Sequence, residues 1–144
     1  AIRLFDDYPR APRGPAPTLR SPLALLSNRS RRCRHRLRCA FTEAFDQARE
    51  RLWLTTPYFA PDRRSQRALC GAARRGVDVR VLVPGKSDVP LAQWAARAAY
   101  AHMLDAGVRI WEYQPRVLHA KTALVDRDWA TVGTANFDYR SFFL

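Results

Sequence analysis

Several features are scarce in this chain of 144 residues, and each scarcity excludes a class of protein. No run approaches the roughly 18 consecutive apolar residues that a membrane-spanning helix needs. The three Cys residues form no C-x-x-C pair, and no His or Cys pair has the spacing of zinc ligands. We therefore interpret the cysteines as reduced thiols and expect neither a structural zinc site nor a disulfide framework.

Lysine is also rare, although the chain is strongly basic. Lys and Arg together number 25, and Lys86 and Lys121 are the two Lys, which leaves 23 Arg. Asp and Glu number only 13, so the net charge is +12. Such a charge is typical of proteins that bind nucleic acid, anionic lipid or phosphorylated substrates, but a solvated basic surface explains it equally well.

The first 28 residues differ in composition from the remainder of the chain. Five of the ten Pro lie within residues 1–22, and apolar periodicity is weak there. This pattern predicts an extended linker or remnant over 1–28 and a folded domain over 29–144. The sequence starts with Ala rather than Met, and we expect it to be part of a longer protein.

A basic helix is predicted at the start of this domain. Residues 29–38 contain six Arg and precede a helical apolar stripe, so we expect a helix over about 31–50. The stripe consists of Phe41, Ala44, Phe45, Ala48 and Leu52. The Arg-rich half is either a solvated helix end or a patch for lipid headgroups or another polyanion.

Strands and helices then alternate along the chain. Strands are predicted over 51–56, 77–83 and 108–113, with helices from Asp62 to about 75 and over about 90–106. This order predicts layered α/β architecture with a largely parallel sheet. The loops "TTPYFAPD" and "PGKSD" follow strands, at the sheet edge where α/β proteins bind ligands. We therefore expect Tyr58 and Phe59 either to line a ligand-binding site or to be ordinary loop aromatics that cover the sheet edge.

A hairpin near the C-terminus carries the polar residues of greatest interest. Residues 118–125 and 130–134 are predicted strands around the turn "DRDW". An even-length hairpin centred on 127 and 128 places Lys121 opposite Thr134 and His119 opposite Asn136. These four polar side chains then share one face, while Leu118, Ala120, Thr122 and Leu124 occupy the packing face. The alternative is an exposed polar face of an edge hairpin.

Such a cluster suits phosphate chemistry. An ammonium group neutralises phosphate charge, and hydroxyl and amide groups complete the oxygen shell. A neutral imidazole beside them can attack phosphorus or transfer a proton near neutral pH. Because Lys121 and Asn136 supply the electrostatics, we expect no metal and no cofactor.

The same residues carry a family resemblance. "HAKTALVD", followed after six residues by "GTAN", resembles the HxKxxxxD…G[S/T]xN (HKD) motif of the phospholipase D superfamily. The stretches "TTPYFAPD", "AARRGVDVRVLVPGKSD", "MLDAGVRIWEYQP" and "ANFDYRSF" are similar to the C-terminal half of bacterial cardiolipin synthases over residues 40–144. The resemblance implies a layered α-β-α phospholipase D-like domain.

The resemblance also implies roles for individual residues. His119 would be one of two catalytic histidines, of which one attacks the phosphodiester and the other protonates the leaving alcohol. Lys121 and Asn136 would hold phosphate oxygens with help from Thr134, and Arg140 would shape the pocket wall beside Tyr58. Asp126 belongs to the catalytic motif, but its place at the strand end favours ordering of the turn.

This sequence departs from the family in one respect that matters for activity. The superfamily needs two HKD motifs, from two halves of one chain or from two subunits, and only one is present here. A Glu that orients the nucleophilic His in the family would fall just past the last residue. We therefore expect one half of a two-half enzyme, truncated at its C-terminus, that is inactive without the first HKD half or a second subunit.

Three classes of function agree with these features, and the first of them has two forms. The resemblance implies first a phosphatidyltransferase that uses phosphatidylglycerol through a phosphohistidine, bound peripherally at the cytoplasmic face of the bacterial inner membrane. With water as acceptor, the same site would be a phospholipase D hydrolase. The alternatives are a dimeric nuclease of the same superfamily with one motif per chain, for which the net charge suits nucleic acid, and a non-catalytic polyanion-binding module.

Overall fold

A mixed sheet forms the centre of the molecule. The computed structural model of the chain describes residues 3–4, 26, 30–86, 97 and 100–138, and within these the main sheet has the order β1-β5-β4-β2-β6-β7. Strands β1, β5, β4 and β2 are parallel, whereas β6 is antiparallel to both β2 and β7. The predicted α/β class with a largely parallel sheet is confirmed. The strands are β1 (Arg3–Leu4), β2 (Arg51–Thr55), β4 (Asp78–Pro84), β5 (Arg109–Tyr113), β6 (Thr122–Val125) and β7 (Trp129–Val132).

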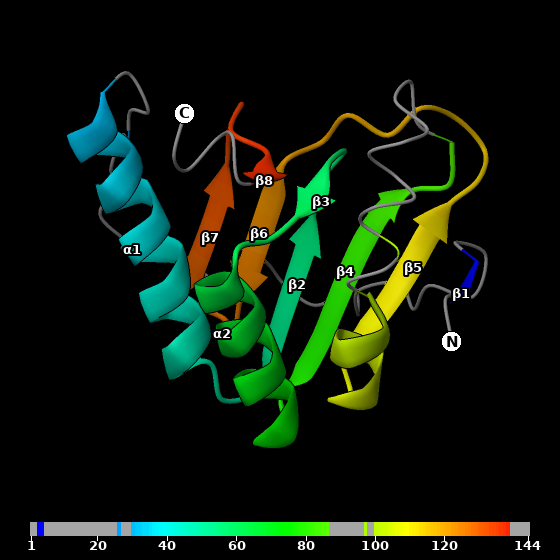
Figure 1. Cartoon of the computed structure of the whole chain (residues 1–144), viewed down its shortest axis with the longest axis horizontal. Coiled ribbons are helices and arrows are strands. Elements are labelled where there is room, and N and C mark those ends of the chain that lie inside the picture. The colour runs from blue at the N-terminus through cyan, green and yellow to red at the C-terminus, as the bar shows by residue number, and fades with distance from the viewer. Residues whose placement is uncertain (1–2, 5–25, 27–29, 87–96, 98–99, 139–144) are drawn as a thin grey trace.

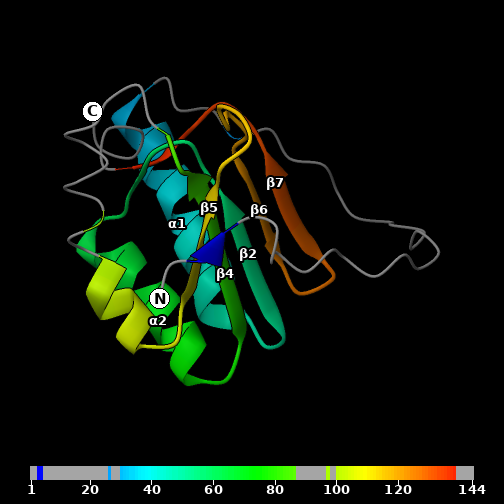
Figure 2. The same cartoon turned by 90° about the vertical axis from the view of Figure 1, so that its right-hand side faces the viewer.

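Two helices cover one face of this sheet, as Figures 1 and 2 show. Helix α1 (Arg31–Gln47) begins where the Ser30 hydroxyl accepts the Cys33 N–H at 3.2 Å. Helix α2 (Arg63–Arg74) begins where the Asp62 carboxylate accepts the Ser65 N–H at 2.8 Å. Both helices were predicted, because cap residues and apolar periodicity are local signals.

The third predicted helix lies only partly within the described residues. Residues 97 and 100–105 are helical, and this segment lies on the same side of the sheet as α2 (Figure 2). Gly107 follows at φ +96, in the left-handed region that favours glycine at a helix end. Within the described residues, the helices lie on one side of the sheet, and none of them is long and apolar enough to cross a bilayer.

The core lies between this sheet face and the helices. Alternate residues of β2 and of the first half of β4 are buried, namely Leu52 and Leu54 of β2 and Val79 and Val81 of β4. Phe45 and Leu69 from the two helices are fully buried against them. The N-terminal region was predicted to be a linker, but Arg3 and Leu4 pair with Trp111 and Glu112 at the sheet edge.

The predicted register of the hairpin is wrong by one residue. β6 and β7 pair Thr122 with Val132 and Val125 with Trp129, so paired numbers sum to 254 rather than 255. The turn therefore has three residues, 126–128, instead of two. Its first residue, Asp126, has φ +52, a left-handed conformation that Asp tolerates better than most residues.

Long-range hydrogen bonds explain this longer turn. The Asp126 carboxylate accepts backbone N–H groups of Arg49 at 3.0 Å, Glu50 at 2.8 Å and Arg51 at 3.0 Å. The Asp126 N–H also donates to the Arg51 carbonyl oxygen at 2.9 Å. These bonds fix Asp126 as the corner residue, and Trp129 then joins the ladder. Because of this shift, Lys121 does not lie across from Thr134, nor His119 across from Asn136.

Candidate active site

The carboxyl end of β2 and the start of β6 meet at one edge of the sheet (Figure 1). Because the two strands are antiparallel, Thr55 at the end of β2 pairs with Thr122 at the start of β6. His119 and Lys121 immediately precede β6 and therefore reach this edge. The same edge carries the loop after β2, and it lies at the carboxyl ends of the parallel strands, where α/β proteins bind ligands.

A second, small sheet brings Asn136 to this edge. Strand β3 (Phe59–Ala60) pairs in parallel with β8 (Phe137–Asp138). Phe59 pairs with Phe137, and each is preceded in the chain by a predicted site residue, Tyr58 and Asn136 respectively. This pairing, rather than the β6–β7 hairpin, brings the "GTAN" segment to the loop after β2.

Thr56 links the loop after β2 to β8 through hydrogen bonds. Its hydroxyl donates to the Tyr58 carbonyl oxygen at 2.9 Å and accepts the Phe137 N–H at 3.0 Å. Its own N–H donates to the Leu82 carbonyl oxygen at 3.1 Å, which prolongs the β2–β4 pairing by one residue. Thr56 is 1% exposed, so these polar groups depend on one another rather than on water.

A cluster of aromatic rings packs the small β3–β8 sheet against α1. The Phe137 ring lies 5.6 Å from Phe41, 5.6 Å from Phe45 and 6.1 Å from Phe59, measured between ring centroids. Trp129 of β7 meets Phe41 at 5.6 Å. Helix α1 therefore contacts both β7 and β8. The strand that follows Asn136 is thus packed against aromatic side chains of α1.

Lys121 lies at the end of the ladder with its ammonium folded back. Its Nζ donates to the His119 carbonyl oxygen at 2.7 Å, and its own carbonyl oxygen accepts the Gly133 N–H at 3.2 Å. The side chain is half-buried, and this burial lowers the pKa of Lys121. An ammonium that has lost part of its water interacts more strongly with an anion than a solvated one does.

The other predicted residues differ in their placement. His119 and Thr134 are exposed, and Asn136 and Tyr58 are half-buried. Within the described residues, no hydrogen bond joins the side chains of His119, Lys121 and Thr134. The structure thus brings three segments to one edge and leaves these side chains open to a ligand. Arg140 lies outside the described residues.

Asp126 lies at the other end of β6. Five residues separate it from Lys121, which is about 16 Å of strand at roughly 3.3 Å per residue. Burial would raise the pKa of its carboxyl, but the N–H groups of Arg51, Glu50 and Arg49 outweigh this and hold that pKa below its usual value. The Asp126 carboxylate thus joins the β6–β7 turn to the connection between α1 and β2, and the structure does not bring it to the edge that carries His119.

Sequence reasoning missed the connecting role of Thr56. The signal was present in the dipeptide "TP", because a residue before proline is kept extended and ends the strand with its side chain fixed in direction. The partner of its hydroxyl lies 81 positions away, and nothing local predicts that pairing. The Asp62–Arg38 contact was missed for the same reason.

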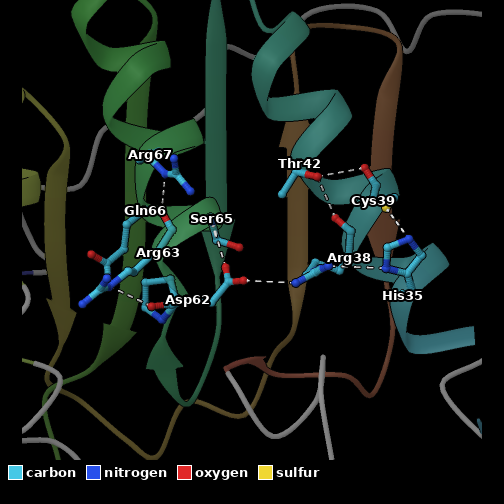
Figure 3. A network of polar contacts seen from close by, with 10 residues as sticks. His35, Arg38, Cys39, Thr42, Asp62, Arg63, Ser65, Gln66 and Arg67 are labelled. Atoms are coloured by element: carbon cyan, nitrogen blue, oxygen red, sulfur yellow. Dashed lines mark hydrogen bonds and ion pairs between the residues drawn. The ribbon is translucent and has the colours of Figure 1, made fainter. Parts of the chain in front are cut away.

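Basic residues surround this edge. The Arg38 guanidinium lies 3.5 Å from the Asp62 carboxylate and joins the first half of α1 to the start of α2, as Figure 3 shows. Arg31, Arg32 and Arg36 of α1 are exposed nearby on the same helix end. Within the described part of the chain, no three His, Cys, Asp or Glu side chains gather in a way that could hold a metal ion.

Comparison with known proteins assigns the chain to a family. The family described as "Cardiolipin synthase, PLD-like domain" matches residues 41–144, which is most of the chain and includes every segment of the site. The chain belongs to this family. The matched range contains His119, Lys121 and the "GTAN" segment, which lie next to β6 and β8 at this edge of the sheet.

Individual relatives agree with this assignment. Cardiolipin synthase A of Yersinia pseudotuberculosis is 45% identical over 105 residues, which are 73% of this chain and 22% of that relative. The PLD-like domain described here thus spans only about a fifth of the length of the curated relatives that it matches.

Solved structures confirm the fold. Nuc of Salmonella typhimurium, a phospholipase D family member, superposes with a TM-score of 0.63 at 23% identity, covering 72% of this chain and 66% of its own. Phosphatidylserine synthase of Haemophilus influenzae superposes with a TM-score of 0.55 at 19% identity, covering 75% and 29% respectively.

Proposed function

We propose that this PLD-like domain is one half of a phosphatidyltransferase of the cardiolipin synthase type. The larger protein that contains it is called the complete protein below. One observation carries the proposal: His119, Lys121 and the segment with Asn136 meet at one sheet edge in a chain 45% identical to cardiolipin synthase A. The chemistry of these side chains suits a phosphodiester, which is the group that such a transferase must cleave and reform.

The proposed reaction has two steps through a phosphohistidine. An imidazole nitrogen, of His119 or of its counterpart in a second motif, attacks phosphorus of phosphatidylglycerol, so that an N–P bond forms while the P–O bond to glycerol breaks. The other imidazole gives its proton to the departing glycerol oxygen. That imidazole next removes a proton from a second alcohol, whose oxygen attacks phosphorus, and the N–P bond breaks.

Electrostatic support for both steps would come from neighbouring residues. Lys121 and Asn136, helped by Thr134, would hold the non-bridging phosphate oxygens, and Tyr58 and Arg140 would line the site. Burial lowers the pKa of Lys121, which agrees with a partly desolvated ammonium. This scheme uses no cofactor. It requires a second HKD motif, which would come from another half of the complete protein or from another subunit.

The substrate requires contact with a membrane surface. The exposed Arg31, Arg32 and Arg36 of α1 would attract anionic lipid by about 1 kcal/mol each. We propose peripheral binding at the cytoplasmic face of the bacterial inner membrane. With water instead of an alcohol as acceptor, the same intermediate would give a phospholipase D hydrolase.

A second candidate is a dimeric nuclease with one motif per chain. The net charge of +12 suits nucleic acid as well as lipid, and the fold superposes on Nuc. The identity to cardiolipin synthase A favours the lipid reaction.

An assay with two substrates separates the candidates. The complete protein is incubated with labelled phosphatidylglycerol and, separately, with plasmid DNA, each as wild type and as His119→Asn. Cardiolipin and glycerol formed by the wild type and lost in the variant support the transferase, and phosphatidic acid would indicate the hydrolase. DNA nicking lost in the variant, without lipid turnover, would refute the proposal in favour of the nuclease.

A further inference from the structure

A cationic pocket lies between α2 and the next helical segment, apart from the motif residues. Its volume is about 400 Å³, and it is lined by Arg63, Gln66 and Arg67 of α2 and by His102. This size falls within the range of small-molecule sites, which is roughly 300–1,000 Å³. None of the four lining residues belongs to the HKD motif or to the loop after β2.

Two of the α2 side chains of this pocket are held by nearby backbone carbonyl groups. Gln66 Nε2 donates to the Pro61 carbonyl oxygen at 2.8 Å, and Arg67 Nε donates to the Arg63 carbonyl oxygen at 3.2 Å, as Figure 3 shows. The second contact orients the guanidinium plane of Arg67 and engages only one of its nitrogens. A ligand that binds there would meet a donor group that is already oriented.

The pocket keeps its positive charge. Within the described residues, three acidic side chains form ion pairs with arginines that do not line the pocket. These pairs are Arg38–Asp62, Arg80–Asp78 and Arg97–Glu112. Arg63, Arg67 and His102 take part in none of the ion pairs of this part of the chain.

This donor set matches a phosphate group. Two guanidinium groups four residues apart on a helix present planar donor forks, which fit phosphate oxygens better than a point charge does. The amide of Gln66 and the imidazole of His102 can add donors from the sides. Arg63, Arg67 and His102 are exposed, so the pocket is open to a ligand from solvent.

We propose that this pocket binds the phosphate of an anionic phospholipid headgroup, at a site separate from the one that carries His119. The inference rests on the proposed function in assuming a lipid surface. Helix α2 begins immediately after β3, at the sheet edge that carries His119, so a headgroup held here would set the distance of that edge from the bilayer.

Vesicle binding by the complete protein tests the proposal. The His119→Asn background prevents turnover, and the probe is phosphatidylcholine vesicles with and without phosphatidylglycerol. The variant Arg63→Ala/Arg67→Ala should bind the anionic vesicles about tenfold or more weakly. The control Arg64→Ala/Arg74→Ala removes the same charge from the same helix outside the pocket and should change binding less than about twofold.

Each other outcome overturns the inference. Equal losses in the two double variants would mean that only the net charge matters. An unchanged affinity in Arg63→Ala/Arg67→Ala would mean that the pocket binds no headgroup. If calorimetry shows that inorganic phosphate binds the pocket while vesicle binding does not depend on it, the ligand is a free phosphate. Vesicle binding is measured without turnover. The result therefore tests the pocket even if the proposed transferase reaction proves wrong.

Discussion

At the scale of single residues, Asp126 governs the geometry of a site that it does not touch. Its carboxylate takes three backbone N–H groups where α1 passes into β2, and its left-handed backbone sets the length of the β6–β7 turn. Through that turn it decides which residue of β7 lies beside Lys121. The geometry of the edge thus depends on a side chain about 16 Å away along β6.

We predict that Asp126→Asn lowers the free energy of unfolding by about 1–3 kcal/mol at neutral pH, because the amide accepts these N–H groups without the charge. The pKa of Asp126 in the folded state lies below the usual 3.8. The contribution of its charge to the free energy of unfolding is therefore complete above pH 3.8, and it is lost as the pH falls through the folded-state pKa. Urea unfolding at several pH values should show the difference between wild type and variant shrinking in acid.

The control for this experiment is Asp128→Asn in the same turn. Asp128 is exposed and accepts none of the hydrogen bonds of the described residues, so the variant should unfold within about 0.5 kcal/mol of the wild type. A difference between wild type and Asp126→Asn that stays constant down to the lowest pH would contradict the assigned role of the charge.

Thr56 has a comparable effect at the site itself. We predict that Thr56→Val, which keeps the shape but removes the hydroxyl, costs about 1–3 kcal/mol because the buried Phe137 N–H loses its acceptor. Turnover by the complete protein should fall as well, since the Asn136 segment loses its link to the loop after β2. Thr55→Val, whose hydroxyl makes no bond within the described residues, should be close to neutral by thermal unfolding and by turnover.

At the scale of elements, the hairpin register is the point that can be tested without activity. Leu124 pairs with Ala130, and both face away from the helices. We predict that Leu124→Cys/Ala130→Cys forms a disulfide on mild oxidation, because directly paired residues have a Cα separation that a disulfide can span. Peptide mass mapping distinguishes this bridge from any pairing with Cys33, Cys39 or Cys70.

The matched variant is Leu124→Cys/Thr131→Cys. In the register that the sequence alone predicted, residues 124 and 131 would pair, whereas in the structure they project to opposite faces of the hairpin. A bridge between 124 and 131, and none between 124 and 130, would show that the hairpin has the even-length turn after all.

The contrast between helices and hairpin explains what could be predicted from sequence. Helices α1 and α2 end within about three residues of their predicted limits, since caps at Ser30 and Asp62 and apolar periodicity are local. The sequence predicted a strand over 118–125 that contains His119 and Lys121, whereas β6 begins at Thr122. The turn length depended on bonds between Asp126 and residues about 75 positions earlier, and no local signal carries that information.

At the scale of the whole molecule, the chain spans only part of the length of its curated relatives. The PLD-like domain matches only 22% of cardiolipin synthase A, and it supplies one imidazole for a reaction that we propose needs two. We predict that the isolated chain, purified as a monomer, does not turn over phosphatidylglycerol. Radiolabelled lipid assays check this, and turnover by the monomer that disappears in His119→Ala would contradict it.

The central claim is that His119 takes part in the chemical step. The most direct measurement is the rate of phosphatidyl transfer by the complete protein as His119→Asn, compared with wild type and with His35→Asn, a histidine of α1 outside the motif. We predict a loss of at least about a hundredfold in His119→Asn, with unchanged circular dichroism, and little loss in His35→Asn. A His119→Asn protein that transfers phosphatidyl groups at the wild-type rate would contradict the account.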